Sequence, residues 1–298
     1  MPTKKELGQI WTGPTTGNPK PIIYLSGSYD LHPRILAELR FCCLSYVDHA
    51  KFDCHPEYLG MFRERGVRCF LDSGAFTYQM QAHKKGRPLD RAAADVVIDQ
   101  YIDWVYKVDF LFDFLVTFDY VRRPDEVLWA TRKIERRGLH PIPVFHQQTP
   151  LDALQALIDK GYGLIGIGGM IPRTKHIIPV LDQIFNITEK RGVRLHGFGV
   201  GSKELITYPW FSVDSTSWLQ AGRFGFVHSV SKDPTKWLGE KVGTSPQRVS
   251  AGQVCADKSL TVGEARAVRL AANIRFWNDL MDRLSRDHRD IKLKQPLF

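Results

Sequence analysis

The sequence predicts an α/β protein, a (β/α)8 barrel with a C-terminal helical extension. Short apolar runs recur between residues 21 and 227, each ending in small or polar residues, and segments with helical periodicity separate them. Strands that are apolar on both faces are typical of parallel sheets covered by helices. Eight such units favour the barrel. An open, doubly wound sheet is the alternative, although no G-x-G-x-x-G follows the first run.

Each predicted strand is a short run, and each predicted helix ends near a glycine or before the next run. The predicted strands are Pro21–Ser26, Arg68–Asp72, Phe114–Asp119, Ile142–Gln147, Leu164–Gly169, Arg194–Gly199, Trp210–Asp214 and a weaker Phe224–Val227. The predicted helices are Pro33–Phe41, Asp90–Lys107, Pro124–Arg137, Pro150–Lys160 and Thr174–Arg191.

The chain of 298 residues is expected to form a barrel domain over residues 1–230 and a basic extension over residues 231–298. A long helix is predicted from Thr261 to about Arg286, where Thr261 and Glu264 have capping-box spacing. Residues 223–298 hold 14 Lys and Arg against 8 Asp and Glu, a net of +6 out of +9 for the whole chain. This excess favours an anionic partner, and nucleic acid is the usual one.

Cysteine usage and hydropathy indicate the compartment. The five cysteines are scattered along the chain, which does not suggest a disulfide framework and favours a reducing cytoplasm. No stretch approaches the length of a membrane span, and the first residues lack the apolar core of a secretion signal. A cytoplasmic protein without a membrane partner is expected.

Polar residues and glycines follow the predicted strands, where barrel enzymes carry their active sites. Three of these residues are carboxylates, Asp72, Asp119 and Asp214, which can influence one another's pKa and divide nucleophilic and acid/base roles. Each aspartate could instead be a helix cap or a turn residue. The other residues at strand ends are Ser73, Gly74, His146, Gln147, Gly168, Gly169, Gly199, Val200, Gly201 and Ser215.

A metal site is a weaker interpretation of the same positions. His146, His196, Asp119 and Asp214 could surround an ion, but the first strand lacks the H-x-H pair of metal-dependent barrel hydrolases. The cluster of Cys42, Cys43, Cys54 and His55 does not match common zinc spacings. Neither a metal nor another cofactor is therefore expected, and a buried histidine is the expected role of His196.

The ordered strand ends resemble the motifs of the tRNA-guanine transglycosylase superfamily, over about 150 residues. Members of that superfamily carry DSGG(F/Y)Q-type, FDE, VQGG-type, GGLAVGE and MGVG motifs, followed by a late nucleophilic aspartate. The corresponding stretches here are DSGAF (Asp72–Phe76), FDY (Phe118–Tyr120), VFHQ (Val144–Gln147), GGM (Gly168–Met170), FGVG (Phe198–Gly201) and VDS (Val213–Ser215).

The resemblance implies a role for each matched residue. Asp214 would attack the ribose C1′ and displace guanine, and Asp72 would be the general acid/base. Asp119 would accept hydrogen bonds from the guanine N1–H and amine, and Gln147 would read the remaining edge. The other implied base contacts are the backbones of Gly168 and Gly169, the rings of Phe76 and Phe198, the adjoining Gly199, and Ser73, which would hold the ligand or order its loop.

Differences between this sequence and the superfamily motifs indicate which nucleic acid would be the substrate. Only Cys255 follows Asp214, so the zinc site of the tRNA enzymes cannot form and no zinc subdomain is expected. The chain looks more like the zinc-free DNA-guanine transglycosylases, which insert a 7-deazaguanine, typically the 7-cyano form. DNA and a free 7-deazaguanine base are then the expected partners, with tRNA as the alternative, and partner proteins of a modification system could take part. Expected phosphate contacts are Lys84, Lys85 and Arg87 in a loop after DSGAF, and Arg122 and Arg123 after FDY.

Other function classes stay open at this stage. A tRNA-directed transglycosylase that lacks zinc is the nearest alternative. A catalytically silent, nucleic-acid-binding barrel and a metal-dependent hydrolase are two further interpretations. The nucleic acid that carries the modified nucleoside distinguishes the DNA enzyme from the tRNA enzyme. Absence of a covalent adduct would indicate the silent barrel, and a stoichiometric bound ion would indicate the hydrolase.

Overall fold

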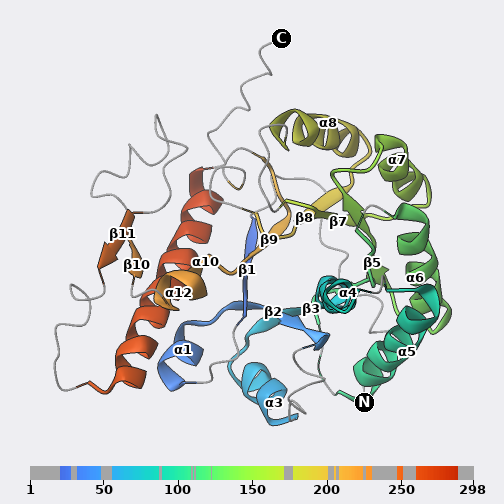
Figure 1. Cartoon of the computed structure of the whole chain (residues 1–298). Coiled ribbons are helices and arrows are strands. Elements are labelled where there is room, and N and C mark those ends of the chain that lie inside the picture. The colour runs from blue at the N-terminus through green and yellow to red at the C-terminus, as the bar shows by residue number, and fades with distance from the viewer. Residues whose placement is uncertain are drawn as a thin grey trace. The chain divides into compact units, whose positions relative to one another are not determined.

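The computed structural model describes residues 21–27, 32–47, 56–86, 89–108, 110, 112–121, 123–170, 177–200, 205, 208–223, 226–229, 247–250 and 260–287 (Figure 1). The chain divides into two compact units. The first contains residues 1–15 and 42–198, and the second contains residues 16–41 and 199–298. No helix within the described residues is both long and apolar enough to cross a membrane.

The first unit is a run of parallel strands alternating with helices. Its strands are β2 (Phe41–Ser45), β3 (Arg68–Asp72), β4 (Leu115–Val116), β5 (Pro141–Ile142), β6 (Val144–His146), β7 (Leu164–Gly168) and β8 (Arg194–Gly197). Its helices are α3 (Pro56–Glu64), α4 (Ala75–Lys84), α5 (Arg91–Lys107), α6 (Pro124–Arg136), α7 (Leu151–Asp159) and α8 (Ile177–Lys190). Helices α5 to α8 follow one another along the outside of the strands, whereas α4 is seen end-on beside β3 (Figure 1).

Pro143 separates two short strands, β5 and β6, that together occupy one strand position of this unit. Val116 pairs with Ile142 on one side, and Val144 pairs with Gly166 on the other. Pro143, which lies between β5 and β6, has no N–H to donate to a ladder. Its carbonyl accepts from the Gly166 N–H at 2.9 Å, so residues 141–146 join the β3–β4 side of the sheet to the β7–β8 side.

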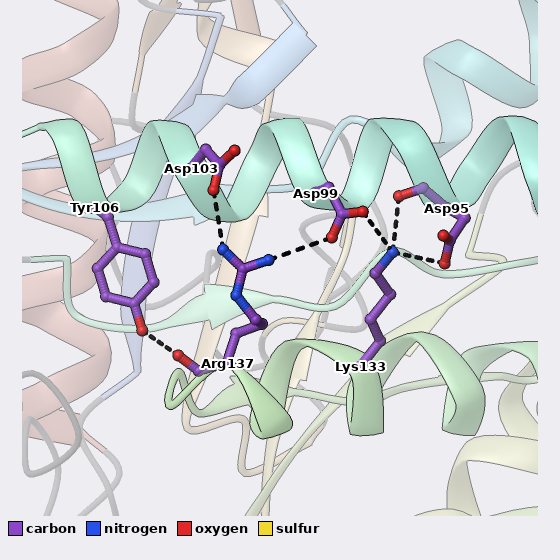
Figure 2. Close-up of polar contacts among 6 residues, drawn as sticks. All are labelled: Asp95, Asp99, Asp103, Tyr106, Lys133 and Arg137. Atoms are coloured by element: carbon purple, nitrogen blue, oxygen red, sulfur yellow. Dashed lines mark hydrogen bonds and ion pairs between the residues drawn. The ribbon is translucent and has the colours of Figure 1, made fainter.

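Helices α5 and α6 are tied together by an ion-pair ladder (Figure 2). Three aspartates spaced four residues apart on α5, Asp95, Asp99 and Asp103, face Lys133 and Arg137 at the end of α6. Lys133 Nζ lies 2.6 Å from Asp95 and 2.9 Å from Asp99, and Arg137 lies 3.0 Å from Asp103. Arg137 and the aspartates are largely exposed, so the Arg137 pairs stabilise the fold weakly. Lys133 is only 13% exposed and binds Asp95 and Asp99 from a mostly buried position.

The second unit contains segments from both ends of the chain. Strand β1 (Ile22–Ser26) pairs in parallel with β9 (Ser212–Ser215), with Ile22 opposite Ser212 and Leu25 opposite Ser215. The other elements of this unit are α1 (Pro33–Glu38), α10 (Ser217–Arg223), β10 (Phe226–Ser229), β11 (Gln247–Ser250) and α12 (Val262–Asp287). Trp218 is fully buried, and its indole N–H donates to the Ser26 carbonyl at 2.9 Å.

The predicted C-terminal helix is confirmed as α12. Its capping box is present, since the Glu264 N–H donates to Thr261 Oγ1 and the Thr261 N–H donates to Glu264 Oε2. Arg275 holds Glu38 of α1 at 2.8 Å. The buried Asn273 joins α12 to two other elements, because its Oδ1 accepts from the His228 N–H and its Nδ2 donates to the Trp218 carbonyl. The helical extension is therefore part of the second unit rather than a loose tail.

Two strand predictions are corrected. The weak eighth strand, Phe224–Val227, is wrong as a barrel strand, because β10 pairs antiparallel with β11. The missing parallel strand is β2, whose FCCLS sequence places Cys42, Cys43 and Leu44 in the core. The prediction stopped at Phe41 as a helix end and treated the cysteines as possible ligands rather than as small apolar residues.

Helix α4 was not predicted at all. It begins directly after β3 because Gly74 adopts φ +74°, a left-handed conformation that turns the chain within one residue. A Cβ on Gly74 would lie 2.2 Å from Val47 Cγ2 and 3.2 Å from the Val47 backbone nitrogen. Glycine is therefore required at this position both by conformation and by space.

We predict that Gly74→Ala destabilises the fold by more than about 2 kcal/mol, because a strained φ and a steric overlap add together. Gly66→Ala is the matched control: Gly66 also has a positive φ, +67°, but its Cβ would meet nothing within 4 Å. Urea unfolding of both variants measures the difference. Equal midpoints for the two variants would show that the Val47 contact does not matter.

His196 lies in the core of the first unit, as expected for a buried histidine. Its ring contacts Phe198 at 4.6 Å, Phe70 at 4.8 Å and Phe114 at 5.1 Å between centroids, and it has 0% exposure. Burial lowers the pKa of His196 to about 3, since an imidazolium would lose its hydration among these rings.

This pKa predicts acid sensitivity. An unfolded histidine binds a proton below about pH 6.5 whereas the folded one does not until about pH 3, so stability is full above pH 6.5 and falls as the pH drops toward 3. The loss reaches about 5 kcal/mol. His196→Phe should flatten this part of the curve of unfolding free energy against pH. An unchanged slope between pH 6.5 and 3 in the variant would contradict the assignment.

Candidate functional site

Asp72 ends β3, and its carboxylate accepts hydrogen bonds from the turn that follows and from the neighbouring strand β2. Its Oδ2 accepts from the Gly74 N–H at 2.9 Å and from the Ser45 hydroxyl at 3.4 Å. The side chain is only half-buried. The turn that starts α4 and the end of β2 therefore orient this carboxylate.

Ser73 takes the second of its two expected roles. Its side chain is fully buried, its hydroxyl donates to the Thr117 carbonyl at 2.9 Å, and its oxygen accepts from the Ala75 N–H at 3.4 Å. These bonds join the end of β3 to the end of β4 and order the loop. Direct ligand contact by Ser73 stays a prediction.

Asp119 follows β4 and forms a close pair with a histidine. Its Oδ2 lies 2.9 Å from His146 Nε2 at the end of β6, and His146 is buried with 5% exposure. Asp119 Oδ1 has no hydrogen-bond partner within the described residues, so it could accept a ligand N–H. His146 Nδ1 is likewise buried and unpartnered in the part of the chain that the structure describes.

Gln79 fixes the backbone on either side of this pair. Its Nε2 donates to the Asp119 carbonyl at 2.8 Å, and its Oε1 accepts from the Val121 N–H at 3.2 Å. One carboxamide on α4 thereby holds the FDY loop by two bonds. Nothing in the sequence pattern marked Gln79, because its partners lie about 40 residues away; the missed helix α4 was the signal that would have pointed to it.

The glycine pair after β7 supports side chains from β6 and the turn that follows it. The Gly168 carbonyl accepts from the Gln147 N–H at 3.2 Å, and the Gly169 carbonyl accepts from Gln147 Nε2 at 2.7 Å and Gln148 Nε2 at 3.0 Å. Gly169 has φ +77°, and the Gln148 carboxamide occupies the space of its absent side chain. Both carbonyls already have protein donors, so base recognition by these glycines and by Gln147 stays a prediction.

The two phenylalanines expected to enclose a base have different surroundings. Phe76 lies on α4 with 63% exposure. Phe198 is half-buried, stacks edge-on against His196 and lies over Gly166, whose Cβ would meet its ring at 2.6 Å. Phe198 is thus built into the strand side chains of the first unit, whereas Phe76 is open to solvent.

Asp214 is the last residue but one of β9 in the second unit, and each of its oxygens accepts a hydrogen bond. The Ser26 hydroxyl donates to Oδ2 at 2.6 Å, and the Gly199 N–H donates to Oδ1 at 2.9 Å. Burial raises the pKa of Asp214 above its ordinary value, and these hydrogen bonds partly offset the rise. Ser26 was missed because its position at the end of β1 matters only through the pairing of β1 with β9.

The expected phosphate-binding cations differ in availability. Lys84 and Lys85 are exposed and form no ion pair within the described residues; Lys84 lies in the last turn of α4 rather than in a loop. Arg123 is bonded to Glu126 at 2.9 Å and lies over the Tyr120 ring, so its charge is partly neutralised. Arg87 and Arg122 lie outside the described residues.

Neither a metal site nor a polar ligand pocket is found among the described residues. No group of three or more His, Cys, Asp or Glu side chains among the described residues could hold an ion; Cys42, Cys43 and Cys69 are buried thiols, and Cys54, His55 and Cys255 lie outside that part of the chain. A cavity of about 100 Å³ lies between α6, β6 and α7. Its lining is mostly apolar, with Asp125, His146 and Thr149 as the polar residues, and so offers few partners to the polar edge of a purine.

Comparison with known proteins identifies the fold. No protein-family model matches the chain, and neither does any curated protein sequence. A putative fructose-1,6-bisphosphate aldolase from Coccidioides immitis superposes with a TM-score of 0.52 at 14% identity, covering 90% of this chain and 92% of that one. Tryptophan synthase from M. tuberculosis gives a TM-score of 0.43 at 12% identity, over 87% of this chain and 94% of that one. The chain is an α/β protein of the (β/α)8-barrel class.

The first of these likenesses confirms the predicted fold class over the doubly wound alternative. At this identity it concerns fold alone. In this class the carboxyl ends of the strands carry the active site. Asp72 and His146 end strands of the first unit and Asp119 follows one, whereas Asp214 lies on β9 of the second unit.

We predict that Gly168→Ala breaks the Asp119–His146 pair. A Cβ there would lie 2.9 Å from both His146 Cε1 and Nδ1, so the imidazole must move. We expect a loss of about 1–3 kcal/mol in unfolding free energy and a shifted ring resonance of His146 by NMR. Gly163→Ala, whose Cβ would meet nothing within 4 Å, is the control. A His146 resonance identical to that of the wild type would refute the contact.

Proposed function

We propose that the protein is a DNA-guanine transglycosylase, which exchanges guanine in DNA for a 7-deazaguanine. The observation that carries the proposal is the environment of Asp214. A carboxylate at the end of a parallel strand accepts one hydrogen bond on each oxygen, from Ser26 and from Gly199. Burial makes it more basic than an ordinary aspartate. Such a group is oriented for attack and, when ionised, is a stronger nucleophile than a solvated carboxylate.

The reaction needs two displacements at the same carbon. An Asp214 oxygen bonds to C1′ as the C1′–N9 bond breaks, through an oxocarbenium-like transition state, and the departing guanine takes a proton from a general acid. The incoming 7-deazaguanine then loses its N9 proton to the same group, and its N9 displaces the Asp214 carboxylate. Asp72 is the proposed acid/base, since it is half-buried and oriented by Gly74 and Ser45.

Recognition of the base is assigned to the Asp119–His146 pair. Asp119 Oδ1 is open to accept from the donor edge of guanine, while its other oxygen is held by His146. The paired histidine fixes the rotamer of the carboxylate, and Gln79 fixes its backbone. Binding therefore requires little reorganisation of the protein.

The net charge of +9 supports a nucleic-acid substrate. A target base inside a duplex must leave the stack before its glycosidic bond can be attacked. DNA is favoured over tRNA because the only cysteine after Asp214 is Cys255, so the zinc site of the tRNA enzymes is impossible here.

The test measures modified nucleosides. Cells that make 7-cyano-7-deazaguanine and express the wild-type protein should contain 7-deazaguanine nucleosides in digested DNA by mass spectrometry, and Asp214→Ala should lower them at least about 1,000-fold. Asp152→Asn, an exposed aspartate in the first turn of α7, is the control.

Other outcomes separate the competing functions. Modified nucleosides in tRNA but not in DNA would identify a tRNA enzyme. A normal level of modification in the Asp214→Ala strain would remove Asp214 from the mechanism. Retained DNA binding without any denaturation-resistant adduct on a guanine-containing oligonucleotide would indicate a binding protein without catalysis.

A further inference from the structure

Among the described residues, helix α4 is anchored along one side. Its buried side consists of Ala75, the half-buried Tyr78, whose ring lies 6.1 Å from that of Phe118, and Gln79, which bonds to the FDY loop. The helix starts at Gly74, two residues after Asp72. Its position is therefore fixed relative to the proposed acid/base group, even though it contributes little to the core.

The other side of α4 is apolar and open to solvent. Phe76 has 63% exposure and Met80 has 40%, and both belong to the few large apolar side chains exposed among the described residues. At about 100° per residue, Phe76, Met80 and Lys84 lie within about 80° of arc. Val121, which Gln79 holds through its N–H, is also exposed. Phe76 and Met80, one turn apart on α4, therefore form an exposed apolar pair that can serve as a contact surface.

Positive charge continues this surface. No Asp or Glu occurs between Ser73 and Leu89. Lys84 and Lys85 end the helix, are exposed and have no ion pair within the described residues. An apolar ridge that ends in exposed cations matches a polymer that has both flat apolar bases and a phosphate backbone.

We propose that α4 is a DNA wedge: Phe76 and Met80 enter the base stack beside the target nucleotide, while Lys84 and Lys85 hold the adjoining phosphates. This inference rests on the proposed function, and it names how the same site opens its substrate. Extrusion of a nucleotide costs stacking energy, and apolar side chains inserted between base steps repay part of it. Ten residues of α4 span about 15 Å, roughly four base steps, so one helix reaches both the gap and the flanking backbone.

An unstacking assay tests the apolar part. The probe is a short duplex with 2-aminopurine next to a guanine, because this base fluoresces more strongly when it loses its stacking neighbour. The wild-type protein should raise the fluorescence, and the double variant Phe76→Ala/Met80→Ala should reduce that rise at least fivefold. Val96→Ala, which shortens an exposed apolar side chain on α5, should keep it. Equal signals from the double variant and the wild type would overturn the wedge.

The salt dependence of binding tests the cations. Removal of two phosphate contacts by Lys84→Ala/Lys85→Ala should reduce the slope of log affinity against log salt by about 1.8. Lys107→Ala, an exposed lysine at the end of α5, should leave it unchanged. An unchanged slope in the double lysine variant would overturn the assignment of phosphate contacts.

Base exchange on two substrates separates this inference from the proposed function. Phe76→Ala/Met80→Ala should lose exchange on the duplex at least tenfold more than on the same guanine in a single strand, which needs no unstacking. If the wild-type protein unstacks the duplex but exchanges the base on neither substrate, the transglycosylase proposal is refuted and the role of α4 as a DNA wedge is retained. Equal losses on both substrates, or concentration-dependent self-association that the double variant abolishes without any effect on DNA, would refute the wedge.

Discussion

A carboxylate that loses water at the end of a buried strand must find a hydrogen-bond donor, and this requirement organises the strand ends of the protein. Asp72 is met by the Gly74 N–H and the Ser45 hydroxyl, Asp119 by His146, and Asp214 by the Ser26 hydroxyl and the Gly199 N–H. In each case at least one donor comes from another strand or from the loop after one. The same contacts that satisfy the charges therefore also tie neighbouring strand ends together.

The sequence was sufficient to predict the alternation of strands and helices. Strand β3 was predicted residue for residue, and α12 within one residue at each end, because an apolar run that stops at Asp72 and a capping box at Thr261 are local signals. Strand β2 was not predicted, because adjacent cysteines are compatible both with a ligand site and with the core, where Cys42 and Cys43 lie. The run at Phe224–Val227 was wrongly predicted as a parallel barrel strand, because a short apolar stretch has the same sequence pattern in a parallel strand and in an antiparallel pair.

Non-local partners could not be predicted. The pairing of Asp119 with His146 joins two motifs that the sequence presents as separate sites, and Gln79 and Ser26 act through residues about 40 and 190 positions away. Helix α4 was missed because it begins without a polar cap, through a glycine whose conformation replaces one. The exposure of Phe76 could not be predicted either, since an aromatic residue in the DSGAF stretch suggests a ring that stacks on a bound base and is covered by it.

The order of segments in the second unit has a consequence for biosynthesis. Strand β1 precedes, and β9 follows, residues 42–198 of the first unit, so their ladder joins residues 190 positions apart along the chain. Residues 42–198 form one uninterrupted stretch and can become compact while the remainder is still being made on the ribosome. The edge of β1 that pairs with β9 must wait until β9 has been synthesised. Closing so long a loop is slow, and during that interval an apolar strand edge is open to chaperones and to aggregation.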